Sequence, residues 1–353
     1  MTFDILKIFI SAALTFFIGI GISSIFTNLA YKYKWWKKTG SKGGALGGGE
    51  TPVFDQLKGE KDTEVKTPRM GGLIIWVSAV ITLLLFWILS YIIPGDIMDK
   101  MNFLSRSQTW LLLATFVAGG VFGLINDALD IISSAYGRSK GLSRYQIISV
   151  VLFIGIVGGS WFYFKLGVSE ITLPLIGIVA IGWFIIPLFV IFMIGLYSGG
   201  VIDGIDGLSG GVFASIFGAY SAIAYFQGQI DIAAFCAAVL GGILAYLWFN
   251  IPPARFWMTE TGTMALTLTI TVIAFLTDTI VPLLIIAFPL IATSASVVLQ
   301  VLSKKLRGGK KIFKITPVHH HFEAIGWPPY KVAMRYWIIS VVCAIIGTVV
   351  ALI

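Results

Sequence analysis

Residues 5–29 read ILKIFISAALTFFIGIGISSIFTNL, an apolar run of 25 residues interrupted by a single charge at Lys7. A helix of about 20 apolar residues crosses the ~30 Å hydrocarbon core of a bilayer, so this run is long enough to span it. The run is also longer than the ~7–15-residue core of a signal peptide, and no small-residue cleavage site follows it. We therefore expect a retained membrane helix.

Nine further apolar runs have the composition of membrane helices. They cover residues 71–93, 110–125, 147–164, 173–197, 212–226, 232–249, 264–276, 280–302 and 332–353. The whole chain is 57% hydrophobic and only 12% charged, whereas about a quarter of the residues of a soluble domain are charged. The sequence predicts one all-α, polytopic membrane domain over residues 1–353, with about ten transmembrane helices.

Positive charge is concentrated on one side of these predicted helices. Of the 25 Lys and Arg residues, 20 lie in the loops after the first, third, seventh and ninth runs. The positive-inside rule places those loops in the cytoplasm and both chain ends outside. The net charge of +8 therefore indicates contact with membrane lipids and no nucleic-acid partner.

Soft metal ligands are scarce in the chain. Cys236 and Cys343 lie inside apolar runs, where a thiol behaves as a small buried hydrophobe. All three histidines stand together at residues 319–321, where consecutive side chains point in different directions and no fourth soft ligand is near, which disfavours zinc. The basic stretch 304–314 before them could equally be a topogenic charge cluster attracted to anionic lipid.

Acidic residues follow three of the apolar runs on the predicted cytoplasmic side. They are Asp127 and Asp130, then Asp203 and Asp206 within a glycine-rich segment, then Glu260. Any one of them alone could be a helix cap or a solvent-facing acid. Together they offer hard oxygen ligands suited to Mg²⁺ shared with substrate phosphates, and the glycines free backbone N–H groups for anions. We expect these acids to converge on a phosphate-handling site.

The ordered motifs resemble the polyprenyl-phosphate N-acetylhexosamine-1-phosphate transferases, over most of the chain. The motifs are residues 68–72 (PRMGG), 126–129 (NDAL), 203–208 (DGIDGL), 250–262, Gln300 with 309–313 (GKKIF), and 317–323 (PVHHHFE). The histidine triplet is the most specific of them. It is typical of the branch that loads phospho-N-acetylmuramoyl-pentapeptide rather than N-acetylglucosamine phosphate.

The resemblance implies a multi-pass enzyme of the bacterial plasma (inner) membrane, commonly a homodimer. Such an enzyme transfers phospho-N-acetylmuramoyl-pentapeptide from UDP-MurNAc-pentapeptide to undecaprenyl phosphate, releasing UMP and lipid I for peptidoglycan synthesis, with Mg²⁺ as cofactor. It further implies catalytic roles for Asp127, Glu260 and His319, with Glu260 at the position of a metal-binding acid. We expect Glu260 to hold the Mg²⁺ with help from Asp127 or Asp206. The expected substrate-binding residues are Lys66, Asp203, Gly204, Ile205, Asp206, Asn250, Trp257, Gln300, His320 and His321.

The chain departs from this family at several positions. Asn126 stands where the first acid of a paired Asp-Asp motif is usual, Glu260 replaces Asp, Gly200 replaces Asn, and Asp130 replaces Lys. A glycine-rich insert at residues 40–49 replaces the usual motif after the first helix. Asn126 cannot act as a base, but a phosphate monoester is already largely dianionic at pH 7 and can attack directly.

Several alternatives stay open from the sequence. The reaction could instead proceed in two steps through a phospho-carboxylate on Asp127 or Glu260. The protein could be a related transferase of N-acetylglucosamine phosphate, or a catalytically impaired homologue that only binds, as the changes at Asn126 and Glu260 suggest. A transporter is the remaining reading, and it would be expected to bury acids in the middle of its helices.

Overall fold

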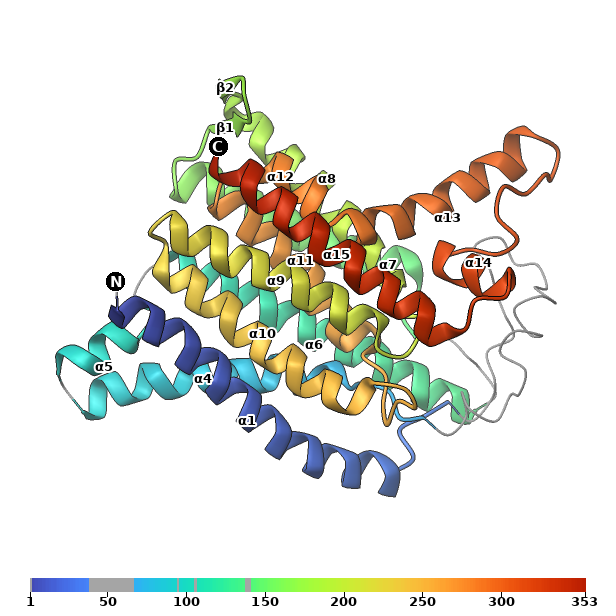
Figure 1. Cartoon of the computed structure of the whole chain (residues 1–353), viewed down its shortest axis with the longest axis horizontal. Helices are drawn as coiled ribbons and strands as arrows, with labels where there is room; N and C mark the ends of the chain where they lie inside the picture. The colour runs from blue at the N-terminus through green and yellow to red at the C-terminus, as the bar shows by residue number, and fades with distance from the viewer. Residues whose placement is uncertain (1, 38–66, 94, 105–106, 137–140) are drawn as a thin grey trace.

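The computed structural model describes residues 2–37, 67–93, 95–104, 107–136 and 141–353, and these residues are almost entirely helical (Figure 1). The helices are α1 (Thr2–Lys32), α4 (Gly72–Ile92), α5 (Asp96–Met101), α6 (Ser107–Ala135), α7 (Arg144–Ser160), α8 (Ile185–Ser198), α9 (Leu208–Phe226), α10 (Ile230–Asn250), α11 (Thr259–Leu276), α12 (Ile280–Ile286), α13 (Phe288–Leu306), α14 (Val318–Ala324) and α15 (Pro329–Leu352). A π-helical turn at Trp161–Lys165, two 3₁₀ turns at Gly182–Phe184 and Gly199–Ile202, and strands β1 (Glu170–Leu173) and β2 (Gly177–Ala180) complete the regular structure.

Nine of the described helical segments are long and apolar enough to cross a membrane, and α12 with α13 would form a tenth span. This confirms the predicted all-α polytopic architecture. The sidedness inferred from the Lys and Arg residues stays a prediction.

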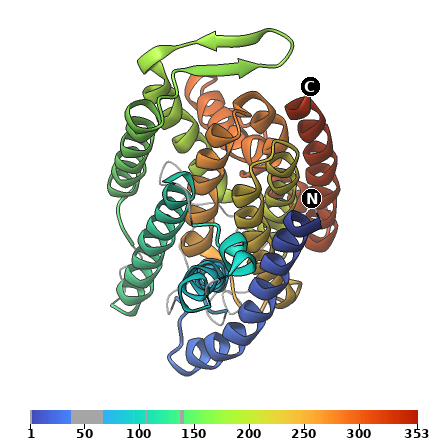
Figure 2. The ribbon, with the colours of Figure 1, turned by 90° about the vertical axis from the view of Figure 1, so that its left-hand side faces the viewer.

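Two of the predicted runs differ from single straight helices. Residues 170–180 form an antiparallel hairpin, with Leu173 opposite Gly177, and the fifth span begins only at Gly182. Pro174 and the positive φ angles of Gly177 and Gly182 favour a turn over a helix here. The ninth run bends by 78° between α12 and α13, next to Pro289 in the first turn of α13. The hairpin projects from one end of the bundle (Figures 1 and 2).

The third predicted run is longer than expected. The hydropathy pattern placed Asp127 and Asp130 at the end of this helix. Helix α6 continues to Ala135, however, so both residues lie inside it. Both side chains are buried. Buried partners from other elements stabilise these acids inside the helix, and no hydropathy window can register such partners.

Helix α11 is the most buried membrane helix and lies in the interior of the bundle, against α4, α6 and α8. Glycines allow its close approach to its neighbours. A Cβ atom on Gly72 of α4 would overlap the backbone of Gly262, and one on Gly123 of α6 would overlap the Glu260 carbonyl oxygen. Three helices therefore meet closely at the first turn of α11, where Glu260 stands.

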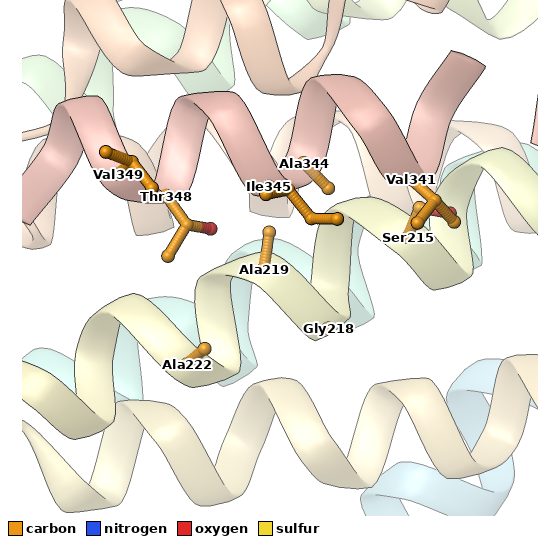
Figure 3. Close-up of a pocket in the computed structure, with 9 residues that line it drawn as sticks. All are labelled: Ser215, Gly218, Ala219, Ala222, Val341, Ala344, Ile345, Thr348 and Val349. Atoms are coloured by element: carbon orange, nitrogen blue, oxygen red, sulfur yellow. The ribbon is translucent and has the colours of Figure 1, made fainter. Parts of the chain in front are cut away.

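A groove of about 370 Å³ lies between α9 and α15 (Figure 3). Gly218 and Ala222 line it from α9, and Ile345 and Val349 line it from α15. It contains none of the predicted site residues. The predicted site residues Asp203 and Asp206 lie instead just before the N-terminal end of α9.

Candidate active site

Two short segments distant in sequence pair with each other and position the start of α11. The N–H of Trp257 donates to the Pro68 carbonyl at 2.9 Å, and the N–H of Gly71 donates to the Trp257 carbonyl at 2.7 Å. The N–H of Gly72 donates to the Met258 carbonyl at 3.1 Å. This pairing fixes the polar first turn of α11 against the start of α4.

Asp127 has two carboxylate oxygens in different environments. Oδ2 accepts hydrogen bonds from the Thr259 hydroxyl (2.5 Å), the Thr261 hydroxyl (2.6 Å) and the Thr261 N–H (2.8 Å). Oδ1 is buried and has no hydrogen-bond partner among the described residues, while Arg69 Nη2 lies 3.7 Å from it. Oδ1 is therefore the oxygen that can take a further ligand.

An ionic network surrounds this carboxylate. Arg69 Nη2 also lies 3.7 Å from Asp130 Oδ2, and Lys37 Nζ lies 2.8 Å from that same oxygen. Asp130 thus holds two cations from other segments close to Asp127. This arrangement accounts for an acid at position 130, because Arg69 and Lys37 bring the positive charge.

Glu260 stands in the first turn of α11 and faces a small pocket shared with Asn126. The Tyr197 hydroxyl lies 3.4 Å from each Glu260 oxygen, which is a long and therefore weak contact. Asn126 Oδ1 accepts a hydrogen bond from the Leu142 N–H at 2.8 Å. Asn126 therefore stabilises the segment after α6, and the Glu260 carboxylate has capacity for another ligand.

Asp203 joins the start of α9 to the start of α11. Its Oδ1 accepts from the Ser209 hydroxyl at 2.7 Å and its Oδ2 accepts from the Thr259 N–H at 2.8 Å. Desolvation raises the pKa of Asp203, and the negative charge of Asp127 adds to that effect, while the two hydrogen bonds and Arg69 oppose it. Asp203 links the glycine-rich loop to the turn that carries Glu260.

Asp206 faces the connection between α10 and α11. Its Oδ1 accepts from Trp257 Nε1 at 3.1 Å and its Oδ2 accepts from the Ala254 N–H at 3.0 Å. In the described part of the chain, no three Asp, Glu, His or Cys side chains are grouped as a ready metal site. The structure therefore does not assemble Asp127, Asp206 and Glu260 into one cluster.

Asn250 fixes the other side of the same loop. Its Oδ1 accepts from the Gly207 N–H at 2.9 Å, and its Nδ2 donates to the Phe256 carbonyl at 2.9 Å. Gly207 has φ +77°, a left-handed conformation that favours glycine. Hydrogen bonds of Asn250 and Asp206 thus connect the 203–207 loop to the segment that carries Trp257. All three residues were predicted to contact the substrate.

The histidine triplet lies in the first turn of α14, and its three side chains contact different groups. A Cβ atom on Gly204 would lie 2.5 Å from His319 Nε2 and 2.8 Å from His320 Nε2, so both rings lie against the glycine-rich loop. Glu323 Oε2 lies 2.5 Å from His320 Nδ1, and His321 Nδ1 accepts from the Lys314 N–H at 3.2 Å. The expected divergence of consecutive histidines therefore does not hold for His319 and His320, whose ring centroids lie 4.3 Å apart, whereas His321 contacts the Lys314 backbone.

Comparison with known proteins decides the family. A family model described as glycosyl transferase family 4 matches residues 109–278. The phospho-N-acetylmuramoyl-pentapeptide-transferase of Listeria monocytogenes serovar 1/2a is 34% identical over 289 residues, covering 81% of this chain and 84% of the relative. The protein of that name from Anoxybacillus flavithermus is 32% identical over 342 residues, 96% of each chain. The chain belongs to the phospho-N-acetylmuramoyl-pentapeptide-transferase family.

Membership in the phospho-N-acetylmuramoyl-pentapeptide-transferase family confirms the resemblance inferred from the motifs. The span matched by the family model runs through most of α6 to α11, so it includes Asp127, Asp203, Asp206, Asn250 and Glu260. Asp127 lies inside α6, Asp203 and Asp206 lie just before α9, Asn250 ends α10, and Glu260 lies in the first turn of α11. Their roles in catalysis and binding remain predictions.

Two substrate-binding predictions for this transferase concern the basic loop and its surroundings. Gln300 Oε1 accepts from the Ile312 and Phe313 N–H groups at 2.9 and 3.0 Å, and its Nε2 donates to the Phe313 carbonyl at 2.8 Å. Gln300 thus holds the basic loop in shape. Lys66 and the glycine-rich insert lie outside the described residues.

Sequence reasoning missed the groups that surround the acids. Thr259, Thr261, Arg69 and Tyr197 all contact Asp127 or Glu260. The alternating Thr-Glu-Thr-Gly-Thr at residues 259–263 was a visible signal, since hydroxyls flanking an acid can donate to buried carboxylates. Tyr197 gave no such signal, and Arg69 stands in the 68–72 motif, but only tertiary packing shows that it reaches Asp127.

Proposed function

We propose that the protein transfers phospho-N-acetylmuramoyl-pentapeptide from UDP-MurNAc-pentapeptide to undecaprenyl phosphate, forming lipid I and UMP. The observation that carries this proposal is the alignment over 96% of the chain with a protein named for that activity. The buried acids next to Arg69, together with the histidine helix against the glycine-rich loop, are consistent with a phosphoryl-transfer site.

The donor set fits a divalent metal. Asp127 Oδ1 is a buried carboxylate oxygen without a hydrogen-bond partner among the described residues, and Glu260 has only the Tyr197 hydroxyl at 3.4 Å. Hard carboxylate oxygens suit Mg²⁺, so Asp127 and Glu260 would hold it, whereas both oxygens of Asp206 already accept hydrogen bonds. When bound, Mg²⁺ would neutralise negative charge on the departing UMP phosphate.

The chain's own residues position the substrates. Arg69 and Lys37 add positive charge beside the acids, and Asp203, Asp206 and Asn250 keep the glycine-rich loop in one conformation for the nucleotide. Asn126 serves as a scaffold for residue 142 and not as a base. Because the lipid phosphate is already largely dianionic at pH 7, we favour its direct in-line attack on the sugar-bearing phosphate.

Donor exchange tests the proposal. Purified protein is given undecaprenyl phosphate and Mg²⁺ with either UDP-MurNAc-pentapeptide or UDP-N-acetylglucosamine, and lipid products are identified by mass spectrometry. We expect lipid I from the first donor only. Product from the second donor alone would indicate the related N-acetylglucosamine-phosphate activity, and no product from either would indicate a protein that only binds.

We also propose that the enzyme resides in the bacterial plasma membrane as a homodimer. Light scattering on detergent-solubilised protein measures the oligomeric state. A mass equal to one chain of 38.4 kDa, after subtraction of detergent, would contradict the dimer.

A further inference from the structure

The C-terminal helix contacts the glycine-rich loop through one side chain. Trp337 of α15 donates its indole N–H to the Gly207 carbonyl at 2.9 Å. The ring occupies a notch at Gly211 in the first turns of α9, where a Cβ atom would overlap the indole nitrogen. Helix α15 is otherwise largely exposed to the membrane, so this contact links a peripheral helix to the candidate site.

Both backbone polar groups of Gly207 form hydrogen bonds with side chains. Its N–H donates to Asn250 Oδ1 at 2.9 Å while its carbonyl accepts from Trp337. The preceding residue, Asp206, accepts from the Ala254 N–H and from Trp257. A glycine at φ +77° has many other conformations open to it, so these partners restrict the loop to one of them.

Trp337 lies in the part of α15 that contacts the candidate site. One helical turn further on, Val341 already lines the groove between α9 and α15 (Figure 3). The next close fit is Gly347 against Ile286 of α12, where a Cβ atom would overlap the Ile286 side chain. The residue before Trp337 also contacts the site, since the centroid of the Tyr336 ring lies 6.4 Å from that of the His319 ring. The start of α15 therefore supports both the loop and the histidine helix.

We propose that Trp337 is a positioning residue for the nucleotide loop, residues 203–207. Its N–H fixes the Gly207 carbonyl, which sets the direction of Gly204 and Asp206 without touching the reacting atoms. The inference rests on the proposed function, in which this loop binds the nucleotide of the donor. Simple space filling by the indole ring is the competing explanation, and it does not depend on the N–H.

Removal of the N–H with retention of the aromatic ring separates the two explanations. Trp337→Phe is compared with wild type, and Trp183→Phe is the matched control because Trp183 is exposed and stacks on Phe184. We expect Trp337→Phe to raise the KM for UDP-MurNAc-pentapeptide about three- to tenfold, the effect of losing one hydrogen bond. The kcat and the thermal midpoint should stay near wild type. An unchanged KM would overturn the proposal, and so would a raised KM accompanied by a clearly lowered thermal midpoint, which is the result expected if the indole ring only fills space.

Amide hydrogen exchange of the peptide covering residues 203–211 gives a readout that does not depend on activity. We expect faster exchange in Trp337→Phe than in wild type and no change in Trp183→Phe. Equal exchange in all three proteins would refute the positioning role. Inactive wild type with faster exchange in Trp337→Phe would instead refute the proposed function and leave the positioning role supported.

A second variant tests whether the indole acts through this contact. Gly211→Ala places a methyl group where the indole nitrogen lies, so it should displace the ring from Gly207 and raise the KM. Because both changes remove the same hydrogen bond, the double variant Gly211→Ala/Trp337→Phe should have the KM of Gly211→Ala alone. Fully additive effects would contradict a shared contact.

Discussion

At Asp127 one carboxylate oxygen is fully hydrogen-bonded and the other is not. Three donors from Thr259 and Thr261 hold Oδ2, and Oδ1 lies beside Arg69. The threonines therefore orient the Asp127 side chain, and Oδ1 stays available for a further ligand. Truncation to alanine would also leave three buried donors without an acceptor, so an isosteric change is the cleaner probe.

We predict that Asp127→Asn abolishes transfer while the protein stays folded. The amide keeps the volume but removes the charge that would bind a divalent cation, and loss of such a stabilising group costs about 100-fold or more in rate. Turnover is measured with the lipid I assay and folding by the thermal midpoint. Full activity in Asp127→Asn would place the metal elsewhere.

Asp203 should give a pH-dependent contribution to stability. Its pKa in the folded protein lies above the ordinary 3.8, so the folded state binds this proton more tightly than the unfolded chain. Its stabilising contribution is therefore present at low pH and is lost as the pH rises through the folded-state pKa. Asp203→Asn, which does not titrate, should therefore show a thermal midpoint that changes less with pH than that of the wild type above the ordinary pKa of 3.8. Identical slopes in the two proteins would show that Asp203 does not titrate abnormally.

His319 lies against Gly204 and is fully buried. We expect His319→Ala to lower kcat much more than it lowers the thermal midpoint, because the ring is part of the wall that faces the nucleotide loop. Steady-state kinetics and a melting curve on the same preparation compare the two effects. Turnover equal to wild type would remove His319 from the site.

At the scale of elements, apolar runs predicted the helices well because hydropathy reports contact with lipid directly. The runs failed where backbone geometry decides, at the hairpin beside Pro174 and at the 78° bend before Pro289. They also ended α6 too early, since Asp127 and Asp130 are stabilised inside it by Thr259, Arg69 and other distant residues. The acids could be singled out from the sequence, and the threonines at 259 and 261 carried a signal, but the contacts of Arg69 and Tyr197 with these acids could not be foreseen, because only packing creates them.

The contact between α6 and α11 provides an element-scale prediction. A methyl group at Gly123 would overlap the Glu260 carbonyl oxygen, so Gly123→Ala should separate these helices and destabilise the protein by about 1–3 kcal/mol. Gly21→Ala is the control, because no atom lies within 4 Å of a Cβ there. Equal thermal midpoints for the two variants would contradict this close packing.

At the scale of the whole molecule, an ion pair joins two helices that lie far apart in the sequence. Lys7 Nζ lies 2.6 Å from Asp231 Oδ1, linking α1 to α10, and 3.4 Å from the Asn102 carbonyl. A buried lysine in a membrane helix is costly unless it is paired, so this pair stabilises one arrangement of α1 on the bundle. It lies apart from the candidate site and has a structural role.

We predict that Lys7→Met lowers the free energy of unfolding by about 1–3 kcal/mol, because Asp231 is left without its cation but is partly exposed. Lys7→Met/Asp231→Leu should recover most of the loss, since neither charge is then buried alone. Thermal unfolding in detergent measures both. A double variant less stable than the single one would contradict the account of this pair.

In the proposed function, Asp127 and Glu260 hold a divalent metal that supports phosphoryl transfer. Release of UMP from UDP-MurNAc-pentapeptide, measured with undecaprenyl phosphate in Mg²⁺ and in excess chelator, tests it most directly, with Glu260→Gln beside the wild type. We predict UMP release by the wild type in Mg²⁺, none in chelator, and a loss of about 100-fold or more in Glu260→Gln. UMP release that persists in chelator, or in Glu260→Gln at the wild-type rate, would contradict it.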